Sequence, residues 1–183
     1  MAAPDLRYVV LGEDSAHGNF VRRWLLSEGV PSRSIRLVPW PAGTGGAGDQ
    51  HVREKYPDEV ADYRRRANAQ RVALVVVTDA DAGTVRDRQH QLDDELAKKQ
   101  GSQRTDAERI AVLVPKQNIE TWLRKLLGSP TSEATNYKPS FKGRTADACA
   151  QCGPRFRDFL RSAHSEADLP SMAIGRDEAQ RLA

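Results

Sequence analysis

Four acidic residues of this chain follow apolar segments that are typical of buried strands. Glu13 comes after RYVVLG, Asp79 and Asp81 come after RVALVVVT, and Glu120 lies shortly after IAVLV. Clustered carboxylates repel one another, so a divalent cation that prefers oxygen ligands is their natural occupant. The spacing predicts an Mg²⁺ or Mn²⁺ site if the fold brings the ends of these segments together. The alternative for any single residue is an ordinary helix cap or a solvated turn.

The elements that must position these carboxylates alternate along the chain. Strands are predicted over residues 7–12, 34–38, 71–78 and 110–114, with helices around residues 20–25 and over 50–68, 84–100 and 119–126. This alternation predicts an α/β fold with a Rossmann-like, mostly parallel sheet of about four strands and helices on both faces. The near-continuous valine content of 71–78 predicts a central strand. Such sheets bind ligands beyond the carboxyl ends of their strands, where the acidic residues would lie.

Three segments resemble a Toprim domain: the strand that leads into Glu13, the run VVVTDAD, and NIETWL with Asn118 and Glu120. The resemblance is strongest to the Toprim domains of overcoming-lysogenization-defect nucleases and related phage-defence proteins, and it covers about residues 7–127. It implies a Toprim-like fold, a divalent metal and cleavage of phosphodiester bonds in nucleic acid. The roles that it implies are metal ligands at Glu13, Asp79 and Asp81, a further ligand or its orienter at Glu120, and a contact to the scissile phosphate at Lys116.

The chain departs from this family at two positions. Asp14 stands where a glycine is usual, and His17 stands where defence nucleases often carry a second acid. One-metal and two-metal mechanisms therefore both stay open. We predict that His17 is a solvent-facing residue in the first turn of a helix, with a metal ligand or a base as the alternative. The chain has no ATPase motif, so the resemblance implies that any ATPase partner is a separate subunit.

Length and composition favour one domain. The chain has 183 residues, of which 39% are hydrophobic and 29% charged, which is typical of a globular protein with a sizeable core. We predict a metal-binding domain over residues 1–128 and a basic loop and helical extension, packed on the same domain, over 129–183. No apolar stretch suits a membrane span. The lack of a leader pattern and the two cysteines, Cys149 and Cys152, predict a cytoplasmic protein whose cysteines are ordinary helix residues.

The extension carries a concentration of basic residues. The formal net charge is +3 and the pI is near 9.0, but residues 138–161 hold six Lys or Arg against two Asp, with aromatic residues between them. This pattern suits the binding of nucleic-acid phosphates. The candidate nucleic-acid-binding residues are Lys138, Lys142, Arg144, Arg155 and Arg157. The alternative is a solvated helix face with the aromatic residues in the core.

Rival motifs leave other functions open. GTGGAG at residues 43–48 matches a phosphate-binding glycine pattern but follows the wrong strand, so we interpret it as a loop. DADAGT at 79–84 is similar to the motif of haloacid-dehalogenase phosphatases, in which the first aspartate is a nucleophile and the second a general acid. We predict an Mg²⁺-dependent Toprim-like nuclease. The alternative functions are a non-catalytic subunit that binds nucleic acid or a partner, and a phosphatase. Assembly into a homo-oligomer is also left open.

Overall fold

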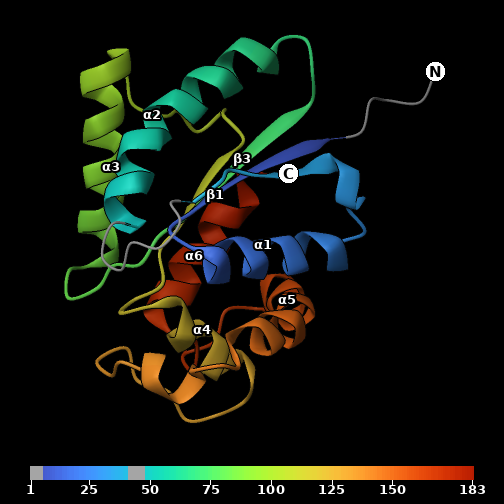
Figure 1. The fold of residues 1–183 in the computed structure, drawn as a ribbon, viewed down its shortest axis with the longest axis vertical. Coiled ribbons are helices and arrows are strands. Elements are labelled where there is room, and N and C mark those ends of the chain that lie inside the picture. The colour runs from blue at the N-terminus through green and yellow to red at the C-terminus, as the bar shows by residue number, and fades with distance from the viewer. Residues whose placement is uncertain (1–5, 41–47) are drawn as a thin grey trace.

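The computed structural model describes residues 6–40 and 48–183 and contains a four-stranded parallel sheet (Figure 1). The strands are β1 (Arg7–Gly12), β2 (Ile35–Leu37), β3 (Val72–Val77) and β4 (Ile110–Leu113). Their order is β2-β1-β3-β4, and each pair of neighbours is parallel. The predicted α/β, Rossmann-like class is confirmed, and each strand lies within two residues of its predicted bounds.

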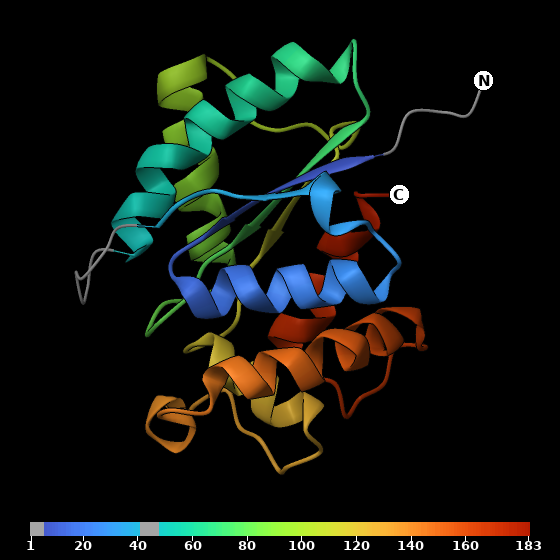
Figure 2. The ribbon, with the colours of Figure 1, turned by 45° about the vertical axis from the view of Figure 1, so that its right-hand side comes forward.

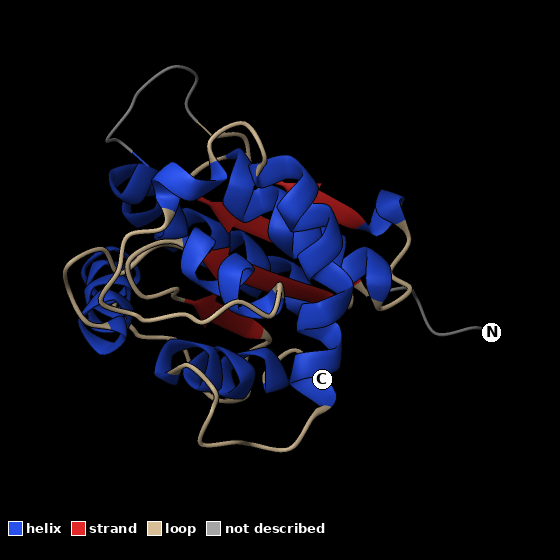
Figure 3. Ribbon diagram, turned by 90° about the horizontal axis from the view of Figure 1, so that it is seen from below, coloured by secondary structure: helices blue, strands red, loops and turns tan. Residues whose placement is uncertain are grey.

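Helices cover both faces of this sheet. They are α1 (Ser15–Ser27), α2 (Gly48–Ala67), α3 (Val85–Gln100), α4 (Ile119–Leu126), α5 (Thr145–Arg161) and α6 (Pro170–Gln180), with short 3₁₀ turns η1 (Ser32–Ser34) and η2 (Lys138–Phe141). Helices α2 and α3 lie on one face, and α1, α4 and α5 lie on the other (Figures 1 and 2). In Figure 3, viewed from the side of α1, α4 and α5, the strands lie behind these helices. None of the helices in the described residues is both long and apolar enough to cross a membrane.

The central strand β3 divides its side chains between two cores. All of its residues are buried. Because successive side chains of a strand point to opposite faces, Val75 and Val77 pack with α1, α4 and α5, whereas Leu74 and Val76 pack with α2 and α3. A strand that is buried on both faces needs apolar residues at every position, which explains the valine run that marked it in the sequence.

Helix α6 covers the edge strand β4. A carboxylate oxygen of Glu178 accepts a hydrogen bond of 2.8 Å from the backbone N–H of Val112. Arg181 donates through Nε to the carbonyl oxygen of Ile110 at 3.1 Å. An uncovered edge strand leaves its backbone groups open to pairing with other chains. Glu178 of α6 and Arg181, which follows the helix, thus bond two backbone groups of β4, so the C-terminal extension covers this edge of the sheet.

Helix α5 packs against α1 and runs in the same direction (Figure 2). The Cys149 thiol donates to the carbonyl oxygen of Ala16 near the start of α1, and Arg157 donates to that of Ser27 at its end. Between these points the helices approach so closely that a Cβ on Gly153 would lie 2.6 Å from Arg23. The extension therefore shares one core with the sheet.

We predict that Gly153→Ala destabilises the whole protein. Alanine favours a helix by about 1 kcal/mol over glycine, but here its methyl group would meet the backbone of α1 at 2.6 Å. Overpacking of this kind costs about 1–3 kcal/mol, so the net free energy of unfolding should fall. Chemical denaturation followed by circular dichroism measures this change, and one cooperative transition should move.

Gln151→Ala is the matched control, because Gln151 is exposed on the same helix. It should change stability by less than about 0.5 kcal/mol. An unchanged midpoint for Gly153→Ala, or a second transition that alone moves, would contradict the shared core.

Candidate metal centre

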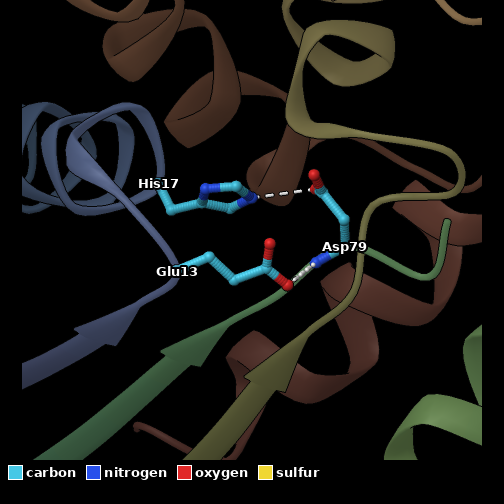
Figure 4. A group of neighbouring side chains, drawn as sticks. All are labelled: Glu13, His17 and Asp79. Atoms are coloured by element: carbon cyan, nitrogen blue, oxygen red, sulfur yellow. Dashed lines mark hydrogen bonds and ion pairs between the residues drawn. The ribbon is translucent and has the colours of Figure 1, made fainter. Parts of the chain in front are cut away.

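Three side chains converge at the carboxyl edge of the sheet (Figure 4). Glu13 follows β1, His17 lies in the first turn of α1, and Asp79 follows β3. One ligand atom from each residue lies within 4.8 Å of the others. The parallel register of β1 and β3 pairs their last residues, Gly12 and Val77, so the chain leaves both strands side by side. The predicted meeting of Glu13 and Asp79 at one edge is therefore observed.

One oxygen of Glu13 is fixed by the end of β3. Oε1 accepts a hydrogen bond of 2.9 Å from the backbone N–H of Asp79 and another from the hydroxyl of Thr78. The other oxygen has no hydrogen-bond partner among the described residues and points toward the space between His17 and Asp79 (Figure 4). Burial raises the pKa of Glu13, and the charge of Asp79 adds to this effect. Glu13 thus offers one oxygen to a cation, and a cation would stabilise its ionised form.

His17 is buried, so its prediction as a solvent-facing residue is wrong. The side chain is 1% exposed. Its Nδ1 lies 2.8 Å from the carboxylate of Asp14, and its Nε2 lies 2.8 Å from Oδ1 of Asp79. Asp14, which stands where the resembling family has glycine, is the N-cap of α1 and also accepts from the backbone N–H groups of Ala16 and His17. This cap orients the first turn so that the ring points inward.

The spacing of the buried residues on α1 carried a signal for this orientation. His17, Phe20, Val21 and Trp24 are all buried, and they follow the spacing of one helix face. A histidine in line with an apolar stripe faces the core with it. The sequence prediction began that stripe at Phe20 and so left His17 out.

The two carboxylates determine the charge of His17. A neutral imidazole donates through only one ring nitrogen, whereas an imidazolium donates through both, and here both nitrogens face carboxylate oxygens. Burial alone would lower the pKa of His17, but the charge of Asp79 and the hydrogen bonds with Asp14 and Asp79 outweigh it and raise the pKa well above its usual value. Burial likewise opposes ionisation of Asp14, yet hydrogen bonds from His17 hold the pKa of Asp14 below its usual value.

Asp81 and Lys116 do not join the cluster. The carboxylate of Asp81 lies 3.2 Å from the guanidinium of Arg88, and its side chain is 65% exposed. Lys116 donates through Nζ to the carbonyl oxygens of Asp81 and Gly83. The structure thus brings Asp79, but not Asp81, together with Glu13 and His17. The roles of Asp81 as a ligand and of Lys116 at a phosphate stay predictions.

Glu120 is buried beside the cluster, outside the group of three. It lies in the first turn of α4, is 5% exposed, and has one oxygen, Oε2, that is buried without a hydrogen-bond partner. Burial raises the pKa of Glu120, and the charge of Asp79 raises it further. Asn118 holds the N-cap position of α4 but makes no side-chain capping bond: its amide nitrogen donates to Asn136, and its Oδ1 is buried without a hydrogen-bond partner among the described residues.

The basic segment divides between the two ends of the molecule. Lys138 lies near enough to Asp81 and Glu120 to act against the rise of their pKa values, and Lys142 and Arg144 precede α5 at the same end. Arg155 and Arg157 instead donate to the carbonyl oxygens that end α4 and α1, at 2.9 and 3.0 Å. Both helices begin at the carboxyl edge and run away from it, so this pair lies at the opposite end from the cluster.

The remaining motifs of the sequence have structural roles or lie outside the described residues. Cys149 and Cys152 are buried, unpaired residues of α5, as predicted. Burial raises the pKa of each thiol to about 12. Of the glycine-rich loop at 43–48, residues 43–47 lie outside the described residues, and Gly48 begins α2.

Comparisons with known proteins do not add to this geometry. No protein-family model matches the chain, and neither the curated proteins nor the solved structures that were searched contain a match. The interpretation of the site therefore rests on its residues and their contacts.

We predict that His17 keeps its proton well above pH 6.5 in the metal-free protein. The raised pKa also has a consequence for stability. The ion pairs of His17 contribute to the free energy of unfolding, and this contribution is fully present below pH 6.5, the ordinary pKa of histidine. Above that pH only the folded state holds the proton, so the contribution is lost as pH rises through the folded-state pKa. NMR titration of the ring protons measures the pKa, and denaturation across the same pH range measures the loss.

His17→Gln removes the titrating ring and should remove this part of the pH dependence. A wild-type His17 that titrates near its ordinary pKa, or a His17→Gln variant with the wild-type pH profile, would contradict the ion-pair assignment.

Proposed function

We propose that this protein is a nuclease that uses Mg²⁺ or Mn²⁺ to cleave phosphodiester bonds in nucleic acid. The observation that carries this proposal is the convergence of Glu13, His17 and Asp79 at the carboxyl edge of a parallel sheet, the edge at which such folds place their ligands. The Toprim-like assignment, made from the segments around Glu13, Asp79 and Glu120, belongs to the same proposal.

The donor atoms fit a small divalent cation. Magnesium is usually held by one or two carboxylates together with several waters. One oxygen of Glu13 has no hydrogen-bond partner in the described part of the chain, and Asp79 uses Oδ1 for His17, which leaves Oδ2 for an ion. Glu13 and Asp79 are therefore the ligands that the geometry favours, and His17 orients Asp79. Glu120, with its unpartnered buried oxygen, is the next candidate.

The residues around this site suit a phosphodiester substrate. A bound divalent ion would lower the pKa of an attacking water and offset charge on the phosphate. Lys138 lies on the same side as the acidic residues, and Lys142 and Arg144 follow it in the chain. These three side chains are exposed and could bind neighbouring phosphates of a polymer.

The arrangement of the aspartates favours a nuclease over a phosphatase. A phosphatase of the haloacid-dehalogenase type needs both aspartates of its motif at one phosphate. Here Asp79 faces His17, whereas Asp81 pairs with Arg88 on the other side of the turn. A non-catalytic Toprim-like binding subunit is the second candidate, and the departures at Asp14 and His17 favour it.

The cellular setting is part of the same proposal. Two buried thiols without a disulfide suit the cytoplasm. The resemblance to phage-defence nucleases favours nucleic acid as substrate and a separate ATPase subunit as partner. Association into a homo-oligomer is open to measurement by sedimentation.

We predict metal-dependent cleavage that requires Glu13 and Asp79. Glu13→Gln and Asp79→Asn keep the side-chain shapes but remove the charges that hold the ion, so each should lower cleavage at least a hundredfold. The assay incubates the protein with plasmid, single-stranded DNA and RNA, each with Mg²⁺, Mn²⁺ or a chelator. Calorimetry on the same variants should show the loss of metal binding.

Asp147→Asn is the matched control, since Asp147 is exposed on α5, and it should cleave as the wild type does. Hydrolysis of an aryl phosphate that needs Asp79 and tolerates Glu13→Gln would favour the phosphatase. Metal binding without cleavage of any substrate would favour the binding subunit.

We predict that only one half of the basic segment supports nucleic-acid binding. Replacing Lys138, Lys142 and Arg144 by Gln should weaken binding and flatten its dependence on salt, because fewer counterions are released. Replacing Arg155 and Arg157 by Gln should leave affinity and salt slope unchanged, because both residues lie at the far end, bonded to helix carbonyls. Fluorescence anisotropy at several salt concentrations measures both quantities. Equal losses in the two variants would contradict this division.

A further inference from the structure

Arg88 joins the parts of the turn that follows β3. It lies in the first turn of α3, and its side chain is 11% exposed. Nε donates to the backbone carbonyl oxygen of Asp79 at 2.9 Å, and Nη2 donates to the carboxylate of Asp81 at 3.2 Å. Nη1 donates to Gln91 at 2.8 Å and to Asp49, at the start of α2, at 3.3 Å. One guanidinium therefore connects the two aspartates and both helices of this face.

The backbone of the turn places the two aspartates on opposite sides. Asp81 has a φ of 50°, in the left-handed region that disfavours residues other than glycine. Lys116 bonds to its carbonyl oxygen, and Gln117, whose φ is 65°, forms a bridge with it. A strained residue persists only where its surroundings hold it. These contacts hold Asp81 toward Arg88 while Asp79 faces His17.

Two protein cations thus compensate the acidic residues of this edge. His17 bonds to Asp14 and Asp79, and Arg88 bonds to Asp49 and Asp81. A site that takes two ions needs carboxylate oxygens for both. Here one oxygen of Asp81, Oδ2, pairs at 3.2 Å with the guanidinium of Arg88, a group that is planar and always charged.

We propose that the centre takes a single divalent ion, and that Arg88 is a positioning residue that keeps Asp81 out of its coordination and replaces a second ion electrostatically. The inference rests on the proposed function, because it presumes that Glu13 and Asp79 bind the first ion. Arg88 touches no ligand atom of that ion and acts only through Asp81 and the turn.

The test counts Mn²⁺ ions per chain by equilibrium dialysis with electron paramagnetic resonance. The wild type should bind one ion. Arg88→Gln should free Asp81 and add a second, weaker ion, while the double variant Arg88→Gln with Asp81→Asn should return to one. Arg88→Lys keeps the charge and should stay at one ion. Arg86 is exposed in the first turn of α3, the helical turn that also holds Arg88. Arg86→Gln is therefore the matched control and should also bind one ion.

Two ions in the wild type, or one ion in Arg88→Gln, would overturn the inference and leave the metal-dependent nuclease intact. No ion in the wild type would overturn both. If Arg88→Gln does not fold, the Mn²⁺ affinity of single aspartate variants that keep Arg88 tests the same inference. Asp81→Asn should then change the Mn²⁺ affinity less than twofold, whereas Asp79→Asn abolishes binding, and a tenfold loss in Asp81→Asn would place Asp81 in the coordination.

Discussion

The electrostatic cost of holding Glu13 and Asp79 together governs the rest of this structure. Two carboxylates that share a partly dry site repel each other, and burial penalises the ionised form of each. The fold offsets this cost with hydrogen-bond donors from the end of β3 and from the first turn of α1. The N–H of Asp79 and the hydroxyl of Thr78 donate to Glu13, and His17 donates to Asp79. Among the described residues, one oxygen on each carboxylate has no such donor, and a cation at that point would complete the compensation.

The position of His17 depends on packing far from the site. Helix α1 carries the His17 ring. Helix α5 fixes α1 through the close approach at Gly153 and through the packing of Phe156 against the rings of Phe20, Trp24 and Trp122. The C-terminal segment therefore does more than add charge to the protein. It holds the helix whose first turn completes the cluster, and through α6 it also covers β4.

Two protein cations lie on different sides of the turn after β3, and each is placed between two carboxylates. On the side of α1, the imidazole of His17 lies between Asp14 and Asp79, and on the side of α3 the guanidinium of Arg88 lies between Asp49 and Asp81. Each cation is held by two acids from different elements. A turn with two aspartates can thus direct one of them to an ion and keep the other for structure, which is chemistry that a DxD pattern alone does not distinguish.

The sequence by itself determined the class of fold, the four strands and the edge at which Glu13 and Asp79 meet. These follow from local patterns, because the period of apolar residues records which faces of a strand or helix are buried. Only the tertiary structure decided that His17 meets Asp79, that Asp81 turns to Arg88, and that Arg155 and Arg157 lie apart from Lys138. The direction of a polar side chain is determined by partners that are distant in the sequence, such as Asp79 for His17. No local period records those pairings, since they form only when the strands, helices and extension pack together.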